Sequence, residues 1–157
     1  MLKKYLFIFF LSMVPIIELR GAIPFAVNWE LDYWTALTVC AIGNMLPVPF
    51  IYFFARKILH WGADKKYIGK FFRFCIEKGE RGGQKLTARA GRGGLFVALM
   101  LFVGIPIPGT GAWTGTLAAS FLNMGIRSTA VSVSLGVVMA GIIMGVASTG
   151  VFSIFGI

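Results

Sequence analysis

The stretch VPIIELRGAIP, residues 14–24, places two prolines, one glycine and two charged side chains in the middle of a long apolar run. Proline removes a backbone hydrogen-bond donor and glycine lowers helix propensity by about 1 kcal/mol, so the centre of this run is expected to be unwound. Unwound backbone is tolerated at membrane depth only where protein buries it or a cavity surrounds it. The stretch therefore predicts a broken segment that other parts of the protein cover.

A second apolar run is interrupted in the same way by GIPIPGTGAWTG, residues 104–115, which contains two prolines and four glycines. The two interrupted runs cover residues 5–27 and 95–122. We interpret each run as a re-entrant helical hairpin or broken helix whose tip lies near the middle of the membrane. A kinked helix that crosses the membrane is the alternative for each run.

Two further apolar runs, residues 34–55 and 128–155, contain no Asp, Glu, Lys, Arg or His. At about 1.5 Å per residue, both are long enough to cross a hydrocarbon layer of ~30 Å as helices. The sequence thus predicts an all-α integral membrane protein in which an interrupted run followed by a spanning helix occurs twice. If each interrupted run returns to the side it came from, the two repeats have inverted topology, a pattern typical of transporters.

Composition and charge support this class. Of the 157 residues, 57% are hydrophobic and 13% are charged, which excludes a water-soluble globular domain. The net charge of +9 is concentrated, since residues 56–92 hold eleven Lys and Arg against three Asp and Glu, a local net charge of +8. By the positive-inside rule, the basic connector, residues 56–93, is expected to face the cytoplasm of a prokaryotic cell. Lys3 and Lys4 fit that rule better if all four runs cross the membrane.

The basic connector is expected to form an amphipathic helix in the membrane interface, with apolar residues on one side and cations on the other. Arg81, Lys85 and Arg89 recur at four-residue spacing and are expected to contact the headgroups of anionic lipids. RNA binding is disfavoured, since no aromatic residues alternate with these cations. We therefore expect membrane lipids as partners and no nucleic acid.

Glu18 and Arg20 are the only charged pair inside an apolar run. Because each charge near the middle of a membrane segment costs about 2.5–3.5 kcal/mol, a functional role is the default hypothesis. Glu18 is a candidate coupling carboxylate that carries a proton or responds to another coupling ion. Arg20 is a candidate ligand for a phosphate or carboxylate. The alternative is a structural ion pair that only fixes the tip of the first hairpin.

The second interruption offers backbone N–H groups instead of charges, since a helix is expected to begin at Ala112 or Trp113. The start of such a helix attracts anions, although a glycine-rich break can also serve only close packing. Asn44, near the centre of the first spanning helix, either bonds to another helix or faces the site. The candidate substrate-binding residues are Arg20, Asn44, Pro108, Gly109, Thr110, Gly111, Trp113 and Thr114.

An enzyme is disfavoured, because the sequence offers no nucleophile–base pair and no cluster of metal ligands. We expect no catalytic residue, no metal and no cofactor. A chain this small leaves much apolar surface, and its hairpin tips need protein cover, so a homodimer or larger assembly is expected.

The motifs ELRGAIP and PIPGTGAWTG, with the chain length and the two-unit order, resemble the small multidrug export family of membrane proteins, which is related to the DedA (SNARE-associated/VTT) superfamily. The residues that carry the resemblance are Glu18, Arg20, Gly21, Pro24, Pro106, Pro108, Gly109, Gly111, Trp113 and Gly115. The resemblance implies two re-entrant hairpins with charged residues inside the membrane, and a role in transport. For DedA relatives it further implies proton-linked handling of lipid phosphates, but the DedA pattern of an acidic residue with arginines around the second hairpin is not found in this sequence.

The leading hypothesis is a small exporter or flippase, coupled to protons, that moves an amphipathic or anionic, lipid-phosphate-like substrate through a site between the two broken segments. Glu18 would be the coupling carboxylate, and Arg20 with the backbone of residues 109–111 would form the anion site. The alternative is a non-transporting membrane scaffold that binds anionic lipid or a protein partner.

Overall fold

A computed structural model describes residues 1–15, 17–107 and 109–155 of the chain. The described residues are helical and contain no strand, which confirms the all-α prediction. The helices are α1 (Leu2–Met13), α2 (Glu18–Asn28), α3 (Tyr33–Met45), α4 (Val48–Ala63), α5 (Gly69–Gly104), α6 (Ala112–Phe121) and α7 (Ile126–Phe155). Two helical stretches, Tyr33–Ala63 and Ile126–Gly150, are long and apolar enough to cross a membrane.

The first interrupted run forms two helices, α1 and α2, that pack against each other as a hairpin. Val14 ends α1 in extended backbone, and α2 begins at Glu18. The break is therefore shorter than expected: Glu18 to Pro24 was predicted to be unwound and is helical. Pro24 is accommodated inside α2, where it removes only one hydrogen bond of the helical ladder.

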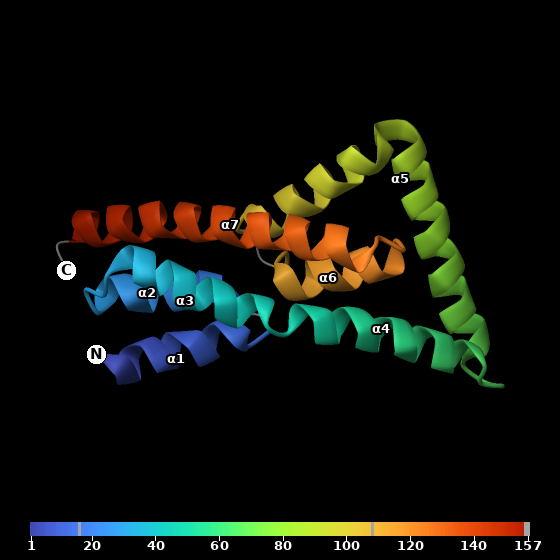
Figure 1. Ribbon diagram of the computed structural model, residues 1–157, viewed down its shortest axis with the longest axis horizontal. Helices are drawn as coiled ribbons and strands as arrows, with labels where there is room; N and C mark the ends of the chain where they lie inside the picture. Colours follow the sequence, from blue (N-terminus) through green and yellow to red (C-terminus); the bar gives the residue numbers. More distant parts are fainter. Residues whose placement is uncertain (16, 108, 156–157) are drawn as a thin grey trace.

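The first predicted spanning helix, residues 34–55, consists of α3 and α4, which run end to end (Figure 1). Asp32 caps α3, since its carboxylate accepts hydrogen bonds from the Thr35 backbone N–H at 2.8 Å and the Thr35 hydroxyl at 2.6 Å. The sequence Leu46–Pro47 separates the two helices, and α4 continues to Ala63. The first eight residues of the basic connector are therefore the end of α4.

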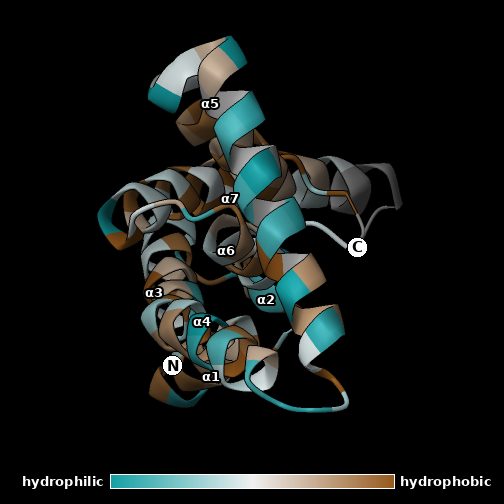
Figure 2. Ribbon diagram, turned by 90° about the vertical axis from the view of Figure 1, so that its right-hand side faces the viewer, coloured by the Kyte–Doolittle hydropathy of each residue, from teal (hydrophilic) through white to brown (hydrophobic). Residues whose placement is uncertain are grey.

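The rest of the basic connector is mostly the first part of α5. A non-helical residue inside α5, Gly91 with φ 69° and ψ 176°, divides this helix into two parts. The first part, residues 69–90, which we call the arm, stands away from the other helices, and Figure 2 shows hydrophilic colour gathered along α5. Beside the loop that follows α4, the arm is held by the Phe72 ring against Gly62 and by a hydrogen bond of 3.1 Å from the Arg73 side chain to the Ala63 carbonyl oxygen.

The second interrupted run also forms a hairpin, made of α5 after Gly91 and of α6. Helix α5 ends at Gly104, and α6 begins at Ala112, where the sequence predicted a helix start. Helix α7 then runs beside α3 in the opposite direction, so both chain ends lie at the end of the molecule away from the arm (Figure 1).

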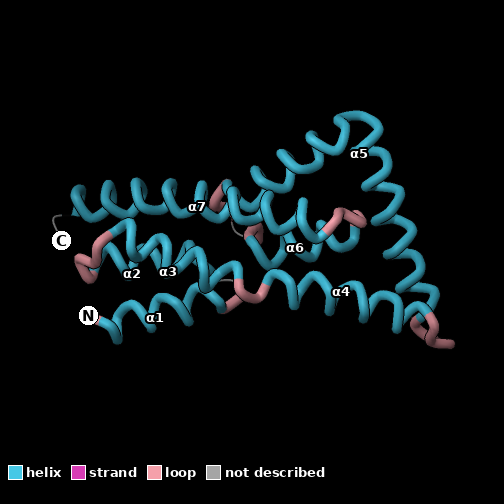
Figure 3. The backbone as a smooth tube through the Cα atoms, in the orientation of Figure 1, coloured by secondary structure: helices cyan, strands magenta, loops and turns pink. Residues whose placement is uncertain are grey.

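The breaks between α1 and α2, between α3 and α4, and between α5 and α6 all lie near the middle of the long axis (Figure 3). The buried core surrounds this level and includes Leu19, Ile23, Val48, Val103 and Val137. Residues of both breaks are nevertheless exposed in this chain, among them Val14, Ile17, Ile105 and Ile107, so the two interruptions are only partly covered by protein.

Small residues bring α7 close to α5. A Cβ atom added at Gly136 would lie 2.7 Å from the Met100 carbonyl oxygen and 2.7 Å from the Val103 Cβ. The Ser132 hydroxyl, one turn earlier, donates to the Phe96 carbonyl oxygen at 2.6 Å. This close approach positions α5 after Gly91, and with it the second break.

Gly136→Ala should therefore destabilise the protein by about 1–3 kcal/mol, because the methyl group has no room against the α5 backbone. Gly150→Ala in the same helix is the matched control, since a Cβ there meets nothing within 4 Å. This control should be neutral or stabilising by up to about 1 kcal/mol. Unfolding in detergent measures both, and an equal effect of the two variants would contradict the packing argument.

Candidate functional site

The two hairpin tips meet through the side chain of Glu18. This carboxylate is only 5% exposed. Its Oε2 accepts a hydrogen bond from the Ala112 N–H at 3.2 Å, and its Oε1 accepts one from the Trp113 N–H at 3.1 Å. Glu18 therefore occupies the start of α6, where a helix has unpaired N–H groups and a partial positive charge.

The local backbone brings Glu18 to this position. Glu18 has a left-handed φ of 51°, which is uncommon for a residue other than glycine. Gly111, directly before α6, is buried and has a φ of 152°. A Cβ atom at Gly111 would lie 2.2 Å from Oε2 of Glu18. The carboxylate can approach the α6 backbone because residue 111 has no side chain.

Arg20 binds the other side of the same break. Its guanidinium donates to the carbonyl oxygens of Ile107 at 2.7 Å, Val103 at 2.9 Å and Ile105 at 3.2 Å. It also donates to the Thr110 hydroxyl oxygen at 3.0 Å. The carbonyl groups after a helix end carry partial negative charge, so a cation at the end of α5 is favourable. Arg20 is thus complementary to the end of α5 as Glu18 is to the start of α6.

The two charges were expected either to bind a substrate or to pair with each other. In the described part of the chain, both side chains bond to the second break rather than to each other. The anion site was predicted at the backbone of residues 109–111, but the N–H groups that bond to the carboxylate of Glu18 are those of the next two residues, Ala112 and Trp113. The junction therefore contains its own anion and its own cation.

The other predicted binding residues lie around this junction in different ways. The Thr110 hydroxyl bonds to Arg20 and lies 2.8 Å from the Ile107 carbonyl oxygen. Gly109 is exposed with a left-handed φ of 86°, and the exposed Thr114 lies 3.4 Å from the Gly111 carbonyl oxygen. Pro108 lies outside the described residues. The junction thus brings together Glu18, Arg20, Thr110, Gly111 and the backbone of Trp113.

Three buried polar atoms near the middle of the molecule have no hydrogen-bond partner among the described residues. They are Oδ1 of Asn44, Nε1 of Trp113 and Oγ1 of Thr116. Asn44 follows Gly43, whose Cα approaches Phe9 and Ser12 near the end of α1, so it lies at the level of the first break. Buried polar atoms are normally paired, so these three are exceptions in the interior of the protein.

Sequence reasoning missed one part of this site. The carbonyl oxygens of Val103, Ile105 and Ile107 were not expected to bind Arg20, although the end of a helix before IPIP leaves unpaired acceptors. Thr116, which adds a third hydroxyl to those of Thr110 and Thr114, is completely buried. The predicted headgroup residues Arg81, Lys85 and Arg89 lie on the arm, exposed and apart from the junction. No three potential metal ligands lie together in the described ranges.

The chain matches a known protein family. The model of a family described as "Putative small multi-drug export protein" matches residues 18–143, which begin directly after the first break and include the second break and the whole junction. No curated protein and no solved structure matches the chain significantly.

Glu18→Ala should lower the free energy of unfolding by about 3 kcal/mol, because it leaves two N–H groups of α6 unpaired and removes a charge-assisted contact worth about 1.5–3 kcal/mol. Glu18→Gln should cost less, since the amide oxygen still accepts one hydrogen bond. Unfolding by SDS in detergent micelles measures both effects. Glu30→Gln, an exposed change in the loop between α2 and α3, is the control and should be neutral; a neutral Glu18→Ala would contradict the capping role.

Proposed function

The chain belongs to the family of putative small multi-drug export proteins, and we propose that it exports small amphipathic compounds across the cell membrane in exchange for protons. The observation that carries the proposal is the junction, where a buried carboxylate and a guanidinium join two interrupted segments. Ionisable groups inside a membrane segment are costly and commonly mark a transport path. Broken segments that meet at mid-membrane are typical of secondary transporters.

The proposed topology has two inverted repeats. The first comprises the α1–α2 hairpin followed by α3 and α4, and the second comprises the hairpin of α5 and α6 followed by α7. Helices Tyr33–Ala63 and Ile126–Gly150 would cross the membrane, while the two hairpins would be re-entrant. The basic connector, which includes the arm, would lie at the cytoplasmic surface, because residues 56–92 carry a net charge of +8 out of the +9 of the whole chain.

In the proposed cycle, Glu18 carries the proton. The ionised carboxylate holds the start of α6 through the N–H groups of Ala112 and Trp113. Protonation removes the negative charge that the α6 N-terminus stabilises, so these bonds weaken and the two tips can separate. Loss of the proton on the other side restores the closed junction. Binding of one proton thus opens the path, and its release closes the path again.

Separation of the tips would also expose the substrate site. Arg20 and the hydroxyl of Thr110 would lose their mutual bond and could bind an anionic or polar part of the substrate. The side chains of Asn44 and Trp113 already offer unpartnered polar atoms. An amphipathic compound could place its polar part among these groups and its apolar part among the surrounding aliphatic side chains.

A membrane scaffold is the second candidate function. The observation in its favour is that every polar atom of Glu18 and several of Arg20 are used in contacts that close the junction. A permanently closed junction would need the same contacts. The scaffold would then bind anionic lipid or a protein partner through the basic connector.

Reconstitution of the full chain into liposomes distinguishes the two functions. We expect wild-type protein to move a cationic fluorescent dye or a labelled lipid phosphate faster when a pH gradient is imposed. Glu18→Gln should insert and fold but lose the dependence on the gradient, whereas Glu30→Gln should retain it. Wild-type protein that moves neither compound, with or without the gradient, would refute export and leave the scaffold.

A further inference from the structure

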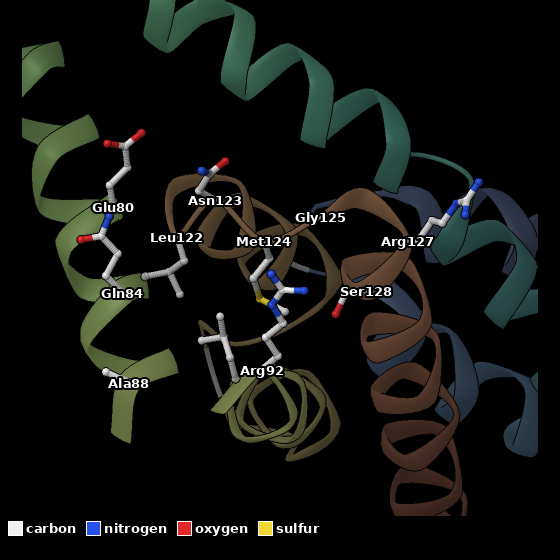
Figure 4. A pocket seen from close by; sticks show the side chains of 11 residues that line it. Glu80, Gln84, Ala88, Arg92, Leu122, Asn123, Met124, Gly125, Arg127 and Ser128 are labelled. Carbon is white, nitrogen blue, oxygen red and sulfur yellow. The ribbon is translucent and has the colours of Figure 1, made fainter. Parts of the chain in front are cut away.

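A groove of about 950 Å³ lies between the arm and the other helices, at the end of the molecule away from the chain termini (Figure 4). Its volume is on the scale of pockets that hold a drug-sized molecule. The groove does not include the junction of the hairpin tips. Its lining residues are Glu80, Gln84, Ala88, Arg92, Leu95, Leu122, Asn123, Met124, Gly125, Arg127 and Ser128.

The arm presents a polar wall to the groove. Glu80, Gln84 and Ala88 recur at four-residue spacing and so share one face of the helix. The cationic series Arg81, Lys85 and Arg89 is offset by one residue, about 100° around the helix axis. A helix that packs on a partner or folds against its own core presents apolar side chains, so the polar inner face of the arm favours a hydrated, hydrogen-bonding occupant.

Arg92 supplies a free cation to this groove. It follows the kink at Gly91 and points across the groove towards Met124 and Ser128 (Figure 4). No described residue forms a hydrogen bond or ion pair with its guanidinium. Arg127 also lines the groove, but its side chain points away from Arg92 in this view. With Glu80 on the opposite wall, the lining residues carry a net charge of +1.

We propose that this groove binds the headgroup of an anionic phospholipid of the phosphatidylglycerol type. The phosphate would accept hydrogen bonds from the planar guanidinium of Arg92, which suits phosphate oxygens. The glycerol hydroxyls would donate to Glu80 and Gln84 on the other wall. Leu95, Leu122 and Met124 form an apolar part of the lining, against which the first carbons of the acyl chains would lie.

The position of the groove supports a lipid as the source of this phosphate. The arm crosses the direction of α4 and α7 at one end of the molecule (Figure 1). If α3–α4 and α7 cross the membrane, as the proposed function requires, the arm lies at the membrane surface, where anionic lipids concentrate. The surrounding cations of the arm raise the local density of these lipids, and the groove then selects one of them.

In the test, each variant inside the groove is paired with a control variant outside it that makes the same substitution. Native mass spectrometry of the full chain in detergent would measure retention of phosphatidylglycerol against phosphatidylcholine. Arg92→Gln should weaken binding of phosphatidylglycerol about tenfold, the loss of one charge-assisted contact, whereas Arg89→Gln should change it less than about twofold. Ala88→Trp should block binding by filling the groove, whereas Ala90→Trp, exposed on the same helix but outside the groove, should not.

Several outcomes would overturn the proposal. Equal losses for Arg89→Gln and Arg92→Gln would indicate diffuse attraction to the whole arm. Unchanged binding in Ala88→Trp would place the lipid elsewhere, and equally tight binding of glycerol phosphate alone would indicate a site for a soluble anion. If the protein loses its lipid and forms a dimer, the groove would be occupied by a second copy of the chain instead of a lipid. Because binding is measured without transport, its failure is separate from a failure of export.

Discussion

The buried carboxylate of Glu18 accepts hydrogen bonds from the start of α6 and so holds the two hairpin tips together. A charge at this depth is costly, and it is tolerated because the N-terminus of a helix supplies two N–H groups and a partial positive charge. The contact also gives α6 its cap, because no side chain of its own segment bonds there. Glu18 of the first hairpin thus pairs with N–H groups of α6 in the second hairpin. Without the other, each tip would leave these polar groups unpaired.

Arg20 makes the corresponding contact at the end of α5. Four acceptors from residues 103–110 converge on one guanidinium, and this arrangement keeps an unwound segment rich in proline and glycine in one conformation. The same bonds also matter for the proposed export cycle. An exporter of the proposed kind must break them in every cycle, so the ionisation of Glu18 would control both the stability of the closed state and the opening of the path.

The molecule separates its charges into two environments. Glu18 and Arg20 balance each other at the middle of the long axis. The excess of positive charge lies in the basic connector, which comprises the end of α4, the following loop, the arm and the residues at the kink of α5. The kink at Gly91 allows one helix to serve both, since its first part follows the surface and its second part packs against α7. A lipid bound in the groove beside the arm would contact both the arm at the membrane surface and the second part of α5, which ends at the junction.

The helical class, the two apolar spans, the interruptions near Pro15 and Pro106 and the start of α6 at Ala112 could all be predicted from the amino-acid sequence. Each of these follows from local properties: hydropathy, helix propensity, and the missing N–H of proline. The sequence also singled out Glu18 and Arg20, because charges are rare in apolar runs. The short first break was not predictable, since tertiary contacts made by Glu18 and Arg20 compensate for helix-breaking residues in α2. That these side chains bond across 83 to 95 residues of sequence to the second break followed only from the folded arrangement, because most of the partners are backbone groups at helix ends, and sequence locates such groups without showing which distant side chain reaches them.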